Sequence, residues 1–394
     1  MAYNAKKEAA KDGRSLQYNT IKVRLHPTPE QAELFEKTFG CCRWIWNNML
    51  ADHERFYIET DKHFIPTPAK YKKEAPFLTE VDNQALTQEY NKLSQAFRVF
   101  FKDPKSFGYP KFKRKKDDRD SFSACNTFWA GGSTIYTTRD AVRLTKAGLV
   151  KASFPRRARS GWKLTRATVE KTRTGKYYGY LLYECPVKTP EPVVPTEETT
   201  VGLKYSLAHF YVTDAGDAAD PPRWLKRSQS KLANIQQKLS RMEPGSKNYL
   251  DAVQKYRLLH EHIANQRKDF IHKETRRITN EWDAVCVRDD HLADIAGALG
   301  GSAVLDTGYG MFRETLRYKL ERQGKQLLSV DRYCPTTKTC SACGCINEDL
   351  SPRALSWTCS GCGTKHKRDI NAAVNIKAQG LSLYQTEQEK QKSA

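Results

Sequence analysis

Four cysteines near the end of the chain form two closely spaced pairs with the spacing of metal ligands. The first pair is Cys340-Ser-Ala-Cys343, and after fifteen residues the second is Cys359-Ser-Gly-Cys362, each followed by a glycine. Four thiolates in two such pairs can enclose a zinc ion tetrahedrally, with Zn–S distances of about 2.3 Å. Because the protein fills all four coordination positions, the pattern predicts a structural zinc site.

The remaining cysteines do not share this spacing. Of eleven cysteines, six lie between Cys334 and Cys362, and the other five are scattered. An intracellular chain seldom holds disulfides, so the cluster favours a metal site. Cys334 and Cys345 fall outside the two pairs, and we expect them to be spare thiols.

Composition and charge limit the class of protein. The 394 residues include 66 Lys and Arg against 45 Asp and Glu, a formal net charge of +21, and 39% are apolar. This length and composition indicate two or three domains with a real core. The chain contains no run of about 18 apolar residues that could cross a bilayer. The first fifteen residues also lack the pattern of a secretory signal. We expect a soluble intracellular protein with no membrane partner.

A basic turn in the first half is a candidate surface for a polyanion. The segment Gly108-Tyr-Pro-Lys-Phe-Lys-Arg-Lys-Lys116 interleaves aromatic residues with cations. Such a run can be no more than a solvated face, but a basic chain with aromatics that can stack on bases is typical of nucleic-acid binding. The candidates for contact with the nucleic-acid backbone are Lys111, Lys113, Arg114 and Lys115.

In the first half of the chain, the spacing of apolar residues predicts a strand, then a helical stretch, then a series of short strands. After a polar lead-in at residues 1–20, residues 21–25 alternate apolar and basic types as a strand does. Thr28 is a candidate helix cap, and apolar residues at helical spacing continue to about Phe101. Residues 121–185 are typical of short strands.

Prolines separate this half from the next. Four prolines within residues 186–200 predict a linker and the main domain boundary. Beyond it, residues 201–213 pattern as a strand, followed by a helical hairpin that turns at Pro244-Gly245-Ser246. Short buried strands are expected at residues 282–287 and 302–305, and the alternation of strands and helices indicates an α/β sheet.

Several local motifs together match one known family. They are Lys22-Val-Arg-Leu-His-Pro27, Val81-Asp-Asn-Gln-Ala-Leu86 leading into Phe97 to Phe101, Gly108-Tyr-Pro-Lys-Phe112, Ala264-Asn-Gln-Arg-Lys-Asp-Phe-Ile-His-Lys273, the four-cysteine pairs and Arg368-Asp-x-Asn-Ala-Ala-x-Asn375. With these motifs, over about residues 20–378, the chain resembles the TnpB proteins of bacterial insertion sequences, relatives of the type V CRISPR nucleases.

The resemblance implies an α+β multidomain fold in which a RuvC-like (RNase H-like) α/β domain follows an oligonucleotide-binding-like β-barrel. The implied parts are a polar lead-in (1–20), the β-barrel or wedge domain (21–29 and 106–186), a helical recognition insertion (30–105), a Pro-rich linker (187–200), the RuvC-like domain (201–335 and 364–378), an inserted four-cysteine zinc ribbon (336–363) and a polar tail (379–394).

The RuvC active site is where the sequence departs from the family. Cleavage there needs three carboxylates that hold two divalent ions about 4 Å apart. The family's Gly-Ile-Asp-x-Gly motif reads Val201-Gly-Leu-Lys204 here, and its Val-Glu-Asp-Leu motif reads Val287-Arg288-Asp289-Asp290. Only the third acid is present, as Asp369. Mg²⁺ prefers hard oxygen ligands, so it is not expected at a site with two cations in place of two acids.

The replaced residues predict an internal salt bridge in place of a metal site. Lys204 and Arg288, facing Asp369, would satisfy one another's charges. Asp290 shares strand parity with Arg288, but in an extended strand it would lie about 7 Å along the chain. Rescue by neighbouring acids is not expected, so the catalytic residues are vestigial and the chain is expected not to be an enzyme.

The resemblance then implies an RNA-guided, sequence-specific DNA-binding protein that lacks nuclease activity, a TnpB-like nuclease-dead repressor (TldR). Its expected partners are a guide RNA and double-stranded target DNA with a short adjacent motif, and promoter occupancy would repress transcription. The expected location is the bacterial cytoplasm, in association with the nucleoid. Two alternatives stay open: an active RNA-guided DNA endonuclease, and a zinc-ribbon DNA-binding protein that needs no guide.

The resemblance to the family also suggests further residues that could contact nucleic acid. The candidates for reading the short DNA motif are Asn83, Gln84, Thr87 and Ser123, for which ordinary helix surface is the alternative. Arg267 and Lys268 either approach the RNA–DNA heteroduplex or form a solvated face.

Overall fold

The computed structural model describes residues 14–116, 120–188, 190–206, 209–220, 223–290, 308–351 and 354–392. The chain forms two compact units, residues 1–188 and 189–394, each with a hydrophobic core of its own. In the described part, no helix is both long and apolar enough to cross a membrane.

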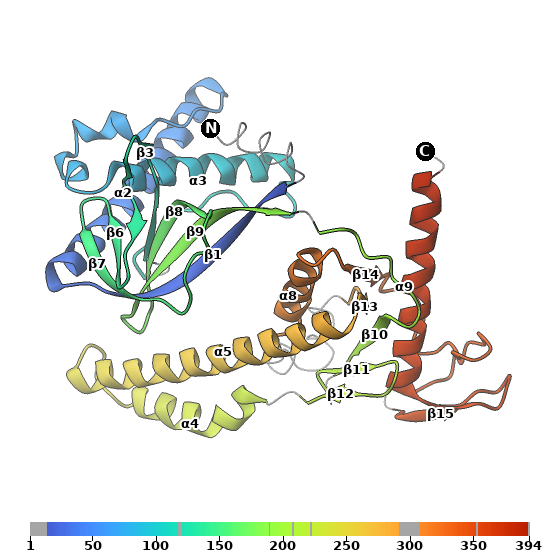
Figure 1. Cartoon of the computed structure of the whole chain (residues 1–394). Helices are drawn as coiled ribbons and strands as arrows, with labels where there is room; N and C mark the ends of the chain where they lie inside the picture. Colours follow the sequence, from blue (N-terminus) through green and yellow to red (C-terminus); the bar gives the residue numbers. More distant parts are fainter. Residues whose placement is uncertain are drawn as a thin grey trace. The chain divides into compact units, whose positions relative to one another are not determined.

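The first unit is built on a seven-stranded antiparallel sheet with the strand order β2-β8-β9-β1-β7-β6-β5 (Figure 1). Its strands are β1 (Arg14–His26), β2 (Ser121–Cys125), β5 (Tyr136–Thr137), β6 (Ala141–Leu144), β7 (Gly148–Ser153), β8 (Lys163–Lys171) and β9 (Tyr177–Lys188). A separate hairpin of β3 (Phe128–Trp129) and β4 (Gly132–Ser133) lies between β2 and β5 in sequence.

The polar lead-in expected at residues 1–20 is partly wrong, because β1 begins at Arg14. β1 pairs with β9 without interruption from Arg14 opposite Lys188 to Leu25 opposite Tyr177. The long partner strand supplies backbone hydrogen bonds to residues whose own pattern gave no strand signal, and the buried Asn19 side chain donates to Cys185 Sγ at 3.5 Å.

The two edges of this sheet approach each other through one side chain. Within the described residues no backbone pairing joins edge strands β2 and β5. Asn126, directly after β2, donates from Nδ2 to the carbonyls of Ile135 (2.7 Å) and Leu164 (2.9 Å), while its Oδ1 accepts from Ile135 N–H at 2.8 Å. The observed architecture is therefore a seven-stranded sheet with linked edges, and a closed barrel stays a prediction.

Helices cover this sheet and share its core. They are α2 (Pro29–Thr60), α3 (Asn83–Lys102) and two 3-10 helices, η1 (Pro68–Lys72) and η2 (Pro76–Thr79). The expected cap at Thr28 is confirmed. The Thr28 hydroxyl accepts a hydrogen bond from Gln31 N–H, and the Gln31 side-chain oxygen accepts one from Thr28 N–H. Phe35 and Phe39 of α2 pack against Phe122 of β2 with ring centroids 5.7 and 5.6 Å apart.

The second unit contains a five-stranded sheet in the order β12-β11-β10-β13-β14. β10 (Thr200–Tyr205), β13 (Ala284–Arg288) and β14 (Gln326–Val330) are parallel, and β11 (Tyr211–Thr213) and β12 (Ala218–Ala219) extend the sheet antiparallel. β14 was not anticipated from the sequence. The strand expected at residues 302–305 lies outside the described residues.

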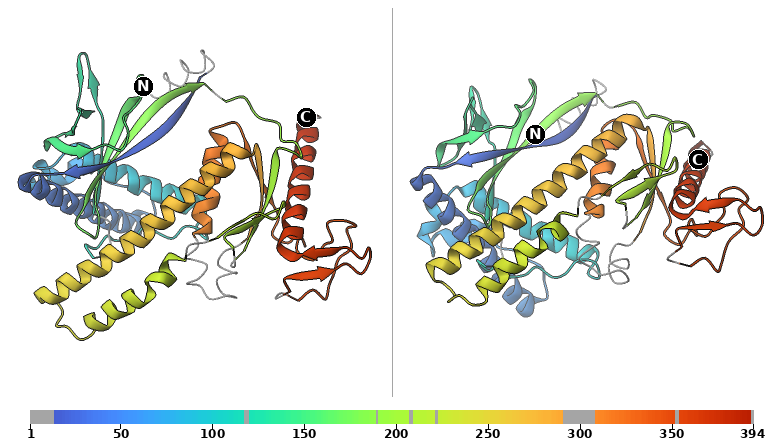
Figure 2. Two further views of the ribbon diagram at one scale, coloured as in Figure 1. Left: turned by 60° about the horizontal axis from the view of Figure 1, so that its bottom comes forward. Right: turned by 90° about the horizontal axis from the view of Figure 1, so that it is seen from below.

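The expected helical hairpin is present between β12 and β13. It consists of α4 (Trp224–Leu239) and α5 (Lys247–Glu281), which run side by side in Figures 1 and 2. The hydroxyl of Ser246, in the expected turn, caps α5 by accepting from Tyr249 N–H. α5 and α8 (Tyr309–Glu321) bury one face of the sheet with Val201, Leu203 and Val285.

A single long helix, α9 (Arg368–Lys392), packs on the sheet (Figure 1). Two expected boundaries are wrong here. The ribbon does not end at residue 363, because β15 (Ser356–Thr358) pairs with β16 (Lys365–Lys367). Residues 379–392, which were expected to form a polar tail separate from the RuvC-like domain, continue α9 as part of one helix.

Candidate functional site

The four cysteines of the ribbon lie on two matching turns. In the first turn, Gly344 N–H donates to Cys340 O at 2.9 Å, and in the second Gly363 N–H donates to Cys359 O at 2.9 Å. Both glycines have positive φ, 79° and 74°, a conformation that side chains disfavour. The glycine after each pair therefore turns the chain so that both sulfurs of a pair face the same point.

The four sulfurs fit the dimensions of a tetrahedral metal site. The Sγ atoms of Cys340, Cys343, Cys359 and Cys362 all lie within 4.8 Å of one another. Two contacts between the pairs, Cys340–Cys362 and Cys343–Cys359, are 3.6 Å. Zn–S bonds of about 2.3 Å give a tetrahedron with edges of about 3.8 Å. The expected gathering of these four thiols is confirmed, and the group could hold zinc.

A neighbouring side chain favours the thiolate form of one of the four sulfurs, that of Cys362. Cys362 Sγ lies within hydrogen-bonding distance of the Thr364 hydroxyl, at 3.2 Å, and this contact is the main reason that the pKa of the Cys362 thiol falls to about 6. The pKa of the Cys343 thiol is instead raised, in part by its contact with Cys362. His366 Nε2 lies 3.0 Å from Cys340 Sγ, and its ring packs on Trp357, its cross-strand partner. Sequence reasoning missed Thr364 and His366; their position directly after the second cysteine pair was the available signal.

The two other nearby cysteines do not belong to this group of four. Cys334 packs near Cys286, Val330 and Ile376 beneath α9. Cys345 lies against Gly361, where an added Cβ would come within 2.6 Å of the Cys345 sulfur.

The sheet and α9 bring together Lys204, Arg288 and Asp369, the three residues that the sequence analysis aligned with the RuvC motifs. A Cβ added to Gly202 would lie 2.1 Å from Ala373 O, so α9 crosses β10 in direct backbone contact. Asp369 lies one helical turn before Ala373, and Lys204 lies two residues after Gly202 on the same face of β10. This close crossing places Asp369 beside Lys204.

Arg288 occupies the neighbouring position on β13. Gly202 pairs with Cys286 in a parallel register, and the same register continued by two residues places Arg288 next to Lys204. The Arg288 guanidinium pairs with Asp290 Oδ1 at 2.6 Å and donates to the Thr336 hydroxyl at 3.5 Å. A salt bridge does form here, but its acid is Asp290 and not Asp369, the acid that the sequence analysis expected.

A tight turn explains why Asp290 reaches Arg288. β13 ends at Arg288, and Asp290 N–H donates to Arg288 O at 2.9 Å, the i-to-i+2 hydrogen bond of a γ-turn. The expectation of about 7 Å between the two residues assumed a continuing strand. The chain instead folds back at Asp289, whose carboxylate pairs with Arg313 of α8.

Lys204 is buried within this charge cluster. Only 9% of the residue is exposed, and its ammonium donates to Tyr205 O at 3.0 Å. Burial lowers the pKa of Lys204, and the nearby Arg288 lowers it further, while Asp290 and Asp369 oppose the shift. The cluster thus combines two cations from the strands with two carboxylates, one of which Arg288 already binds.

Asp369 also lines a pocket of about 420 Å³ at the junction of β11, β12, the ribbon and α9. The charged neighbours of Asp369 in this lining are Lys367 and Arg368, and His209 lies in the wall, where its Nδ1 is 2.8 Å from Asp220. Among the described residues, only the four cysteines form a group of three or more His, Cys, Asp or Glu that could hold a metal ion.

The candidates for reading a DNA motif divide into two groups. Asn83 is exposed at the start of α3, and Gln84 and Thr87 are partly exposed on the same helix. Ser123 of β2 is only 5% exposed, and its hydroxyl lies 2.8 Å from that of Thr168. Base contact stays a prediction for the helix residues, whereas the burial of Ser123 argues against direct contact.

The basic residues of the turn at 108–116 also differ in their surroundings. Lys111, Arg114 and Lys115 are exposed. Lys113 instead pairs with Glu89 at 2.9 Å and lies 4.3 Å from the centre of the Trp46 ring. Because Glu89 is fully buried, Lys113 is needed inside the fold, and the expectation that it contacts nucleic acid is not favoured by its surroundings.

The two candidates on α5 differ in the same way. Lys268 is exposed. The stem of Arg267 packs on Gly308, the cap of α8, where an added Cβ would meet Arg267 Cδ at 2.8 Å. Arg267 therefore helps to position α8 and is only partly exposed, whereas Lys268 is exposed.

Three sequence profiles match parts of the chain. The profile of a probable transposase of the IS605 OrfB type matches residues 181–296, a Cas12f1-like TNB domain matches residues 309–376, and a helix-turn-helix domain matches residues 18–62. In the structure, the last of these segments is the end of β1 followed by the start and body of one continuous helix, α2.

Curated relatives match over most of their length. A putative RNA-guided DNA endonuclease of Streptomyces pristinaespiralis is 30% identical over 376 residues, which cover 92% of this chain and 89% of the relative. The putative RNA-guided DNA endonuclease InsQ of Escherichia coli K12 is 26% identical, with 92% of each chain covered. The chain belongs to the TnpB/IS605 family, as its motifs indicated.

A solved structure shares the fold. Cas12f1, determined by cryo-electron microscopy as a complex with sgRNA and target DNA, superposes with a TM-score of 0.58 at 12% identity, covering 93% of this chain and 99% of Cas12f1. The protein therefore has a Cas12f-like multidomain α+β fold.

Proposed function

We propose that this protein is an RNA-guided, sequence-specific DNA-binding protein that does not cut DNA. Family membership, with relatives named as RNA-guided DNA endonucleases, supports a guide RNA and double-stranded target DNA as partners. The net charge of +21 is suited to two polyanionic partners. Reading of a short motif beside the target is assigned to the exposed face of α3 that carries Asn83, Gln84 and Thr87.

The pairing of Arg288 with Asp290 is the observation that supports loss of cleavage. A two-metal site needs carboxylate oxygens facing the scissile phosphate. At the corresponding place, Arg288 engages the nearest alternative acid, and the buried Lys204 lies beside Asp369. A divalent ion would have to displace both cations, so we assign no Mg²⁺ to this site.

Repression follows from occupancy. A guided complex that stays on its target without cutting would block RNA polymerase wherever the guide matches a promoter, and the complex would fractionate with the nucleoid. The four-cysteine group would hold one structural zinc ion, because all its ligand positions come from the protein and none is left for water.

The first experiment identifies the guide. The chain is purified from cells that carry its own locus, and the RNA that accompanies it is sequenced. One discrete RNA with a constant scaffold and a short variable end supports guided binding, and its variable part names the target. Only background ribosomal and messenger RNA would leave a zinc-ribbon DNA-binding protein that needs no guide.

The second experiment tests cleavage with the same complex. A target plasmid is incubated with the guided wild-type complex and Mg²⁺, with Asp369→Ala as the matched control. We expect binding without nicking or linearisation in both. Mg²⁺-dependent cleavage by the wild type that disappears in Asp369→Ala would overturn the proposal and establish an active endonuclease.

A further inference from the structure

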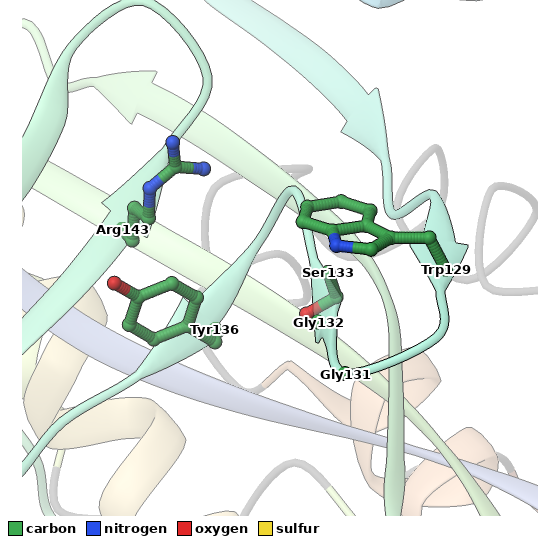
Figure 3. A pocket seen from close by; sticks show the side chains of 6 residues that line it. All are labelled: Trp129, Gly131, Gly132, Ser133, Tyr136 and Arg143. Atoms are coloured by element: carbon green, nitrogen blue, oxygen red, sulfur yellow. The ribbon is translucent and has the colours of Figure 1, made fainter.

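A pocket of about 550 Å³ lies on the first unit, and none of the residues assigned above lines it. Figure 3 shows Trp129 on one side of it and Tyr136 with Arg143 on the other, with Gly131, Gly132 and Ser133 between them. The lining thus has two aromatic rings, one cation and no carboxylate. We propose that this pocket binds one unpaired nucleobase by stacking, with Arg143 directed at the adjacent phosphate.

The exposed aromatic rings are the first argument. Trp129 is 57% exposed and Tyr136 is 43% exposed, although burial of such rings normally stabilises a fold. Phe128, next to Trp129, is also exposed and has Lys163 Nζ 4.4 Å from its ring centre. Exposed aromatic rings interleaved with cations suit a nucleobase, because every base offers a π-face and carries a phosphate.

The pocket is also fixed in shape before any ligand arrives. A Cβ on Gly132 would come within 2.8 Å of the Trp129 indole, so the ring lies directly against the glycine backbone. Asn126 holds the base of the β3–β4 hairpin through its bonds to Ile135 and to the Thr134 hydroxyl. A preformed stacking surface avoids the entropy cost of ordering the hairpin on binding.

Arg143 is held at the edge of this surface. Its Nη1 donates to Thr134 O at 2.7 Å, and its guanidinium carbon lies 5.7 Å from the centre of the Tyr136 ring, its cross-strand partner. A guanidinium has five N–H donors, so the donors that do not face Thr134 can serve a phosphate. The Arg143 guanidinium and the Tyr136 ring therefore lie side by side, so that one nucleotide could contact both with its phosphate and its base.

The unpaired base can come from the guide RNA or from a displaced DNA strand, and the inference rests on the proposed nucleic-acid function for that source. The test uses the full-length chain and short single strands of one sequence, as RNA and as DNA, each with a central 2-aminopurine. We expect quenching of 2-aminopurine on binding, and Trp129→Ala should weaken binding by about 5- to 150-fold. Trp129→Phe should restore most of the affinity.

Further variants separate stacking from general charge. Arg143→Gln should weaken binding and reduce the salt dependence by about one phosphate contact, whereas Arg143→Lys should keep the salt dependence. Tyr333→Ala is the matched control, because Tyr333 is an exposed ring beside Arg332 in the other unit. Photo-crosslinking of the same strands, read by mass spectrometry, should mark the segment around Trp129.

The outcomes are distinct. A loss of affinity with RNA only assigns the guide as the source, a loss with DNA only assigns the displaced strand, and a loss with both assigns a base regardless of sugar. The proposal that this pocket binds a base would be overturned if Trp129→Ala bound both strands as tightly as the wild type. It would also be overturned if Tyr333→Ala lost as much affinity as Trp129→Ala. The RNA that copurifies with Trp129→Ala tests guided binding separately, so failure of one proposal does not imply failure of the other.

Discussion

The Arg288 guanidinium and the Asp290 carboxylate form a 2.6 Å ion pair across a single intervening residue at the end of β13. Both partners are largely shielded from solvent: the side chain of Arg288 is 20% exposed and that of Asp290 is 7% exposed. Asp290 is therefore already engaged by Arg288, and the adjacent acid, Asp289, pairs with Arg313 of α8.

Removing one member of this pair should destabilise the second unit. In Arg288→Ala, Asp290 stays buried without its cation, which should cost about 1–3 kcal/mol and lower the melting temperature by several degrees. The measurement is thermal unfolding of the full-length chain. Arg317→Ala is the matched control, because its pair with Glu314 is exposed and should contribute less than about 1 kcal/mol. Adding Asp290→Asn to Arg288→Ala should restore part of the stability; a strictly additive double variant would contradict the coupling.

Burial of Lys204 should make stability depend on pH. Its folded pKa is lowered from the ordinary value of 10.5, so between the two values the unfolded chain binds more protons than the folded chain. Stability should therefore rise with pH across that interval in the wild type, relative to Lys204→Met. The melting temperatures of the two proteins are compared from neutral pH to about pH 10. Lys231→Met, at an exposed position of α4, should show no such trend relative to wild type.

The four-cysteine group should hold one zinc ion per chain. Bound zinc, measured by mass spectrometry, should be absent from Cys340→Ser and from Cys359→Ser, while Cys334→Ser and Cys345→Ser should retain it. Chelation should lower the melting temperature of the wild type, since metal binding stabilises the folded ribbon. A wild-type chain purified without chelator and free of zinc would refute this assignment.

Gly202 should not accept a side chain. Because a Cβ there meets Ala373 O at 2.1 Å, Gly202→Ala must displace α9 from β10, at a cost of about 1–3 kcal/mol. Gly40 provides the control: it lies inside α2 with no atom near the position of an added Cβ, so Gly40→Ala should stabilise by about 0.5–1 kcal/mol. Thermal unfolding of both variants tests the packing, and similar melting temperatures would contradict it.

The basic turn should separate binding from stability. Replacing Lys111, Arg114 and Lys115 together by alanine should weaken DNA binding and reduce the slope of log K against log salt by about 0.9 for each phosphate that the variant no longer neutralises. Lys113→Ala should instead destabilise the fold, because the buried Glu89 then keeps only one of its two cations. Fluorescence anisotropy of labelled duplex DNA at several salt concentrations, with melting curves alongside, distinguishes the two effects.

The sequence predicted those parts of the site that depend on local spacing. The two cysteine pairs, the glycines after them and the turn before α5 are each encoded within a few residues, and all three are present. Proximity of Lys204, Arg288 and Asp369 came from the family motifs and agrees with the packing of α9 on the sheet. The partner of Arg288 could not be predicted, since it depends on where β13 ends and turns.

Elements stabilised by distant partners were the ones missed. Residues 14–20 form a strand because β9 is long enough to pair with them. β14 is only partly buried along most of its length, so it shows weak apolar patterning, and its place is set by pairing with β13. The last turns of α9 carry polar residues on all sides, and the helix persists there because its beginning is fixed on the sheet.

The ion pair of Arg288 and Asp290 also restricts the evolutionary routes open to the gene. Reverting Arg288 alone to glutamate would set a second carboxylate against the buried Asp290, and like charges at that distance oppose each other. Reverting Lys204 alone would leave Arg288 satisfied and the second acid missing. A single substitution toward an acidic centre is thus either unfavourable for folding or leaves the set of acids incomplete, so an acidic centre would require both substitutions together.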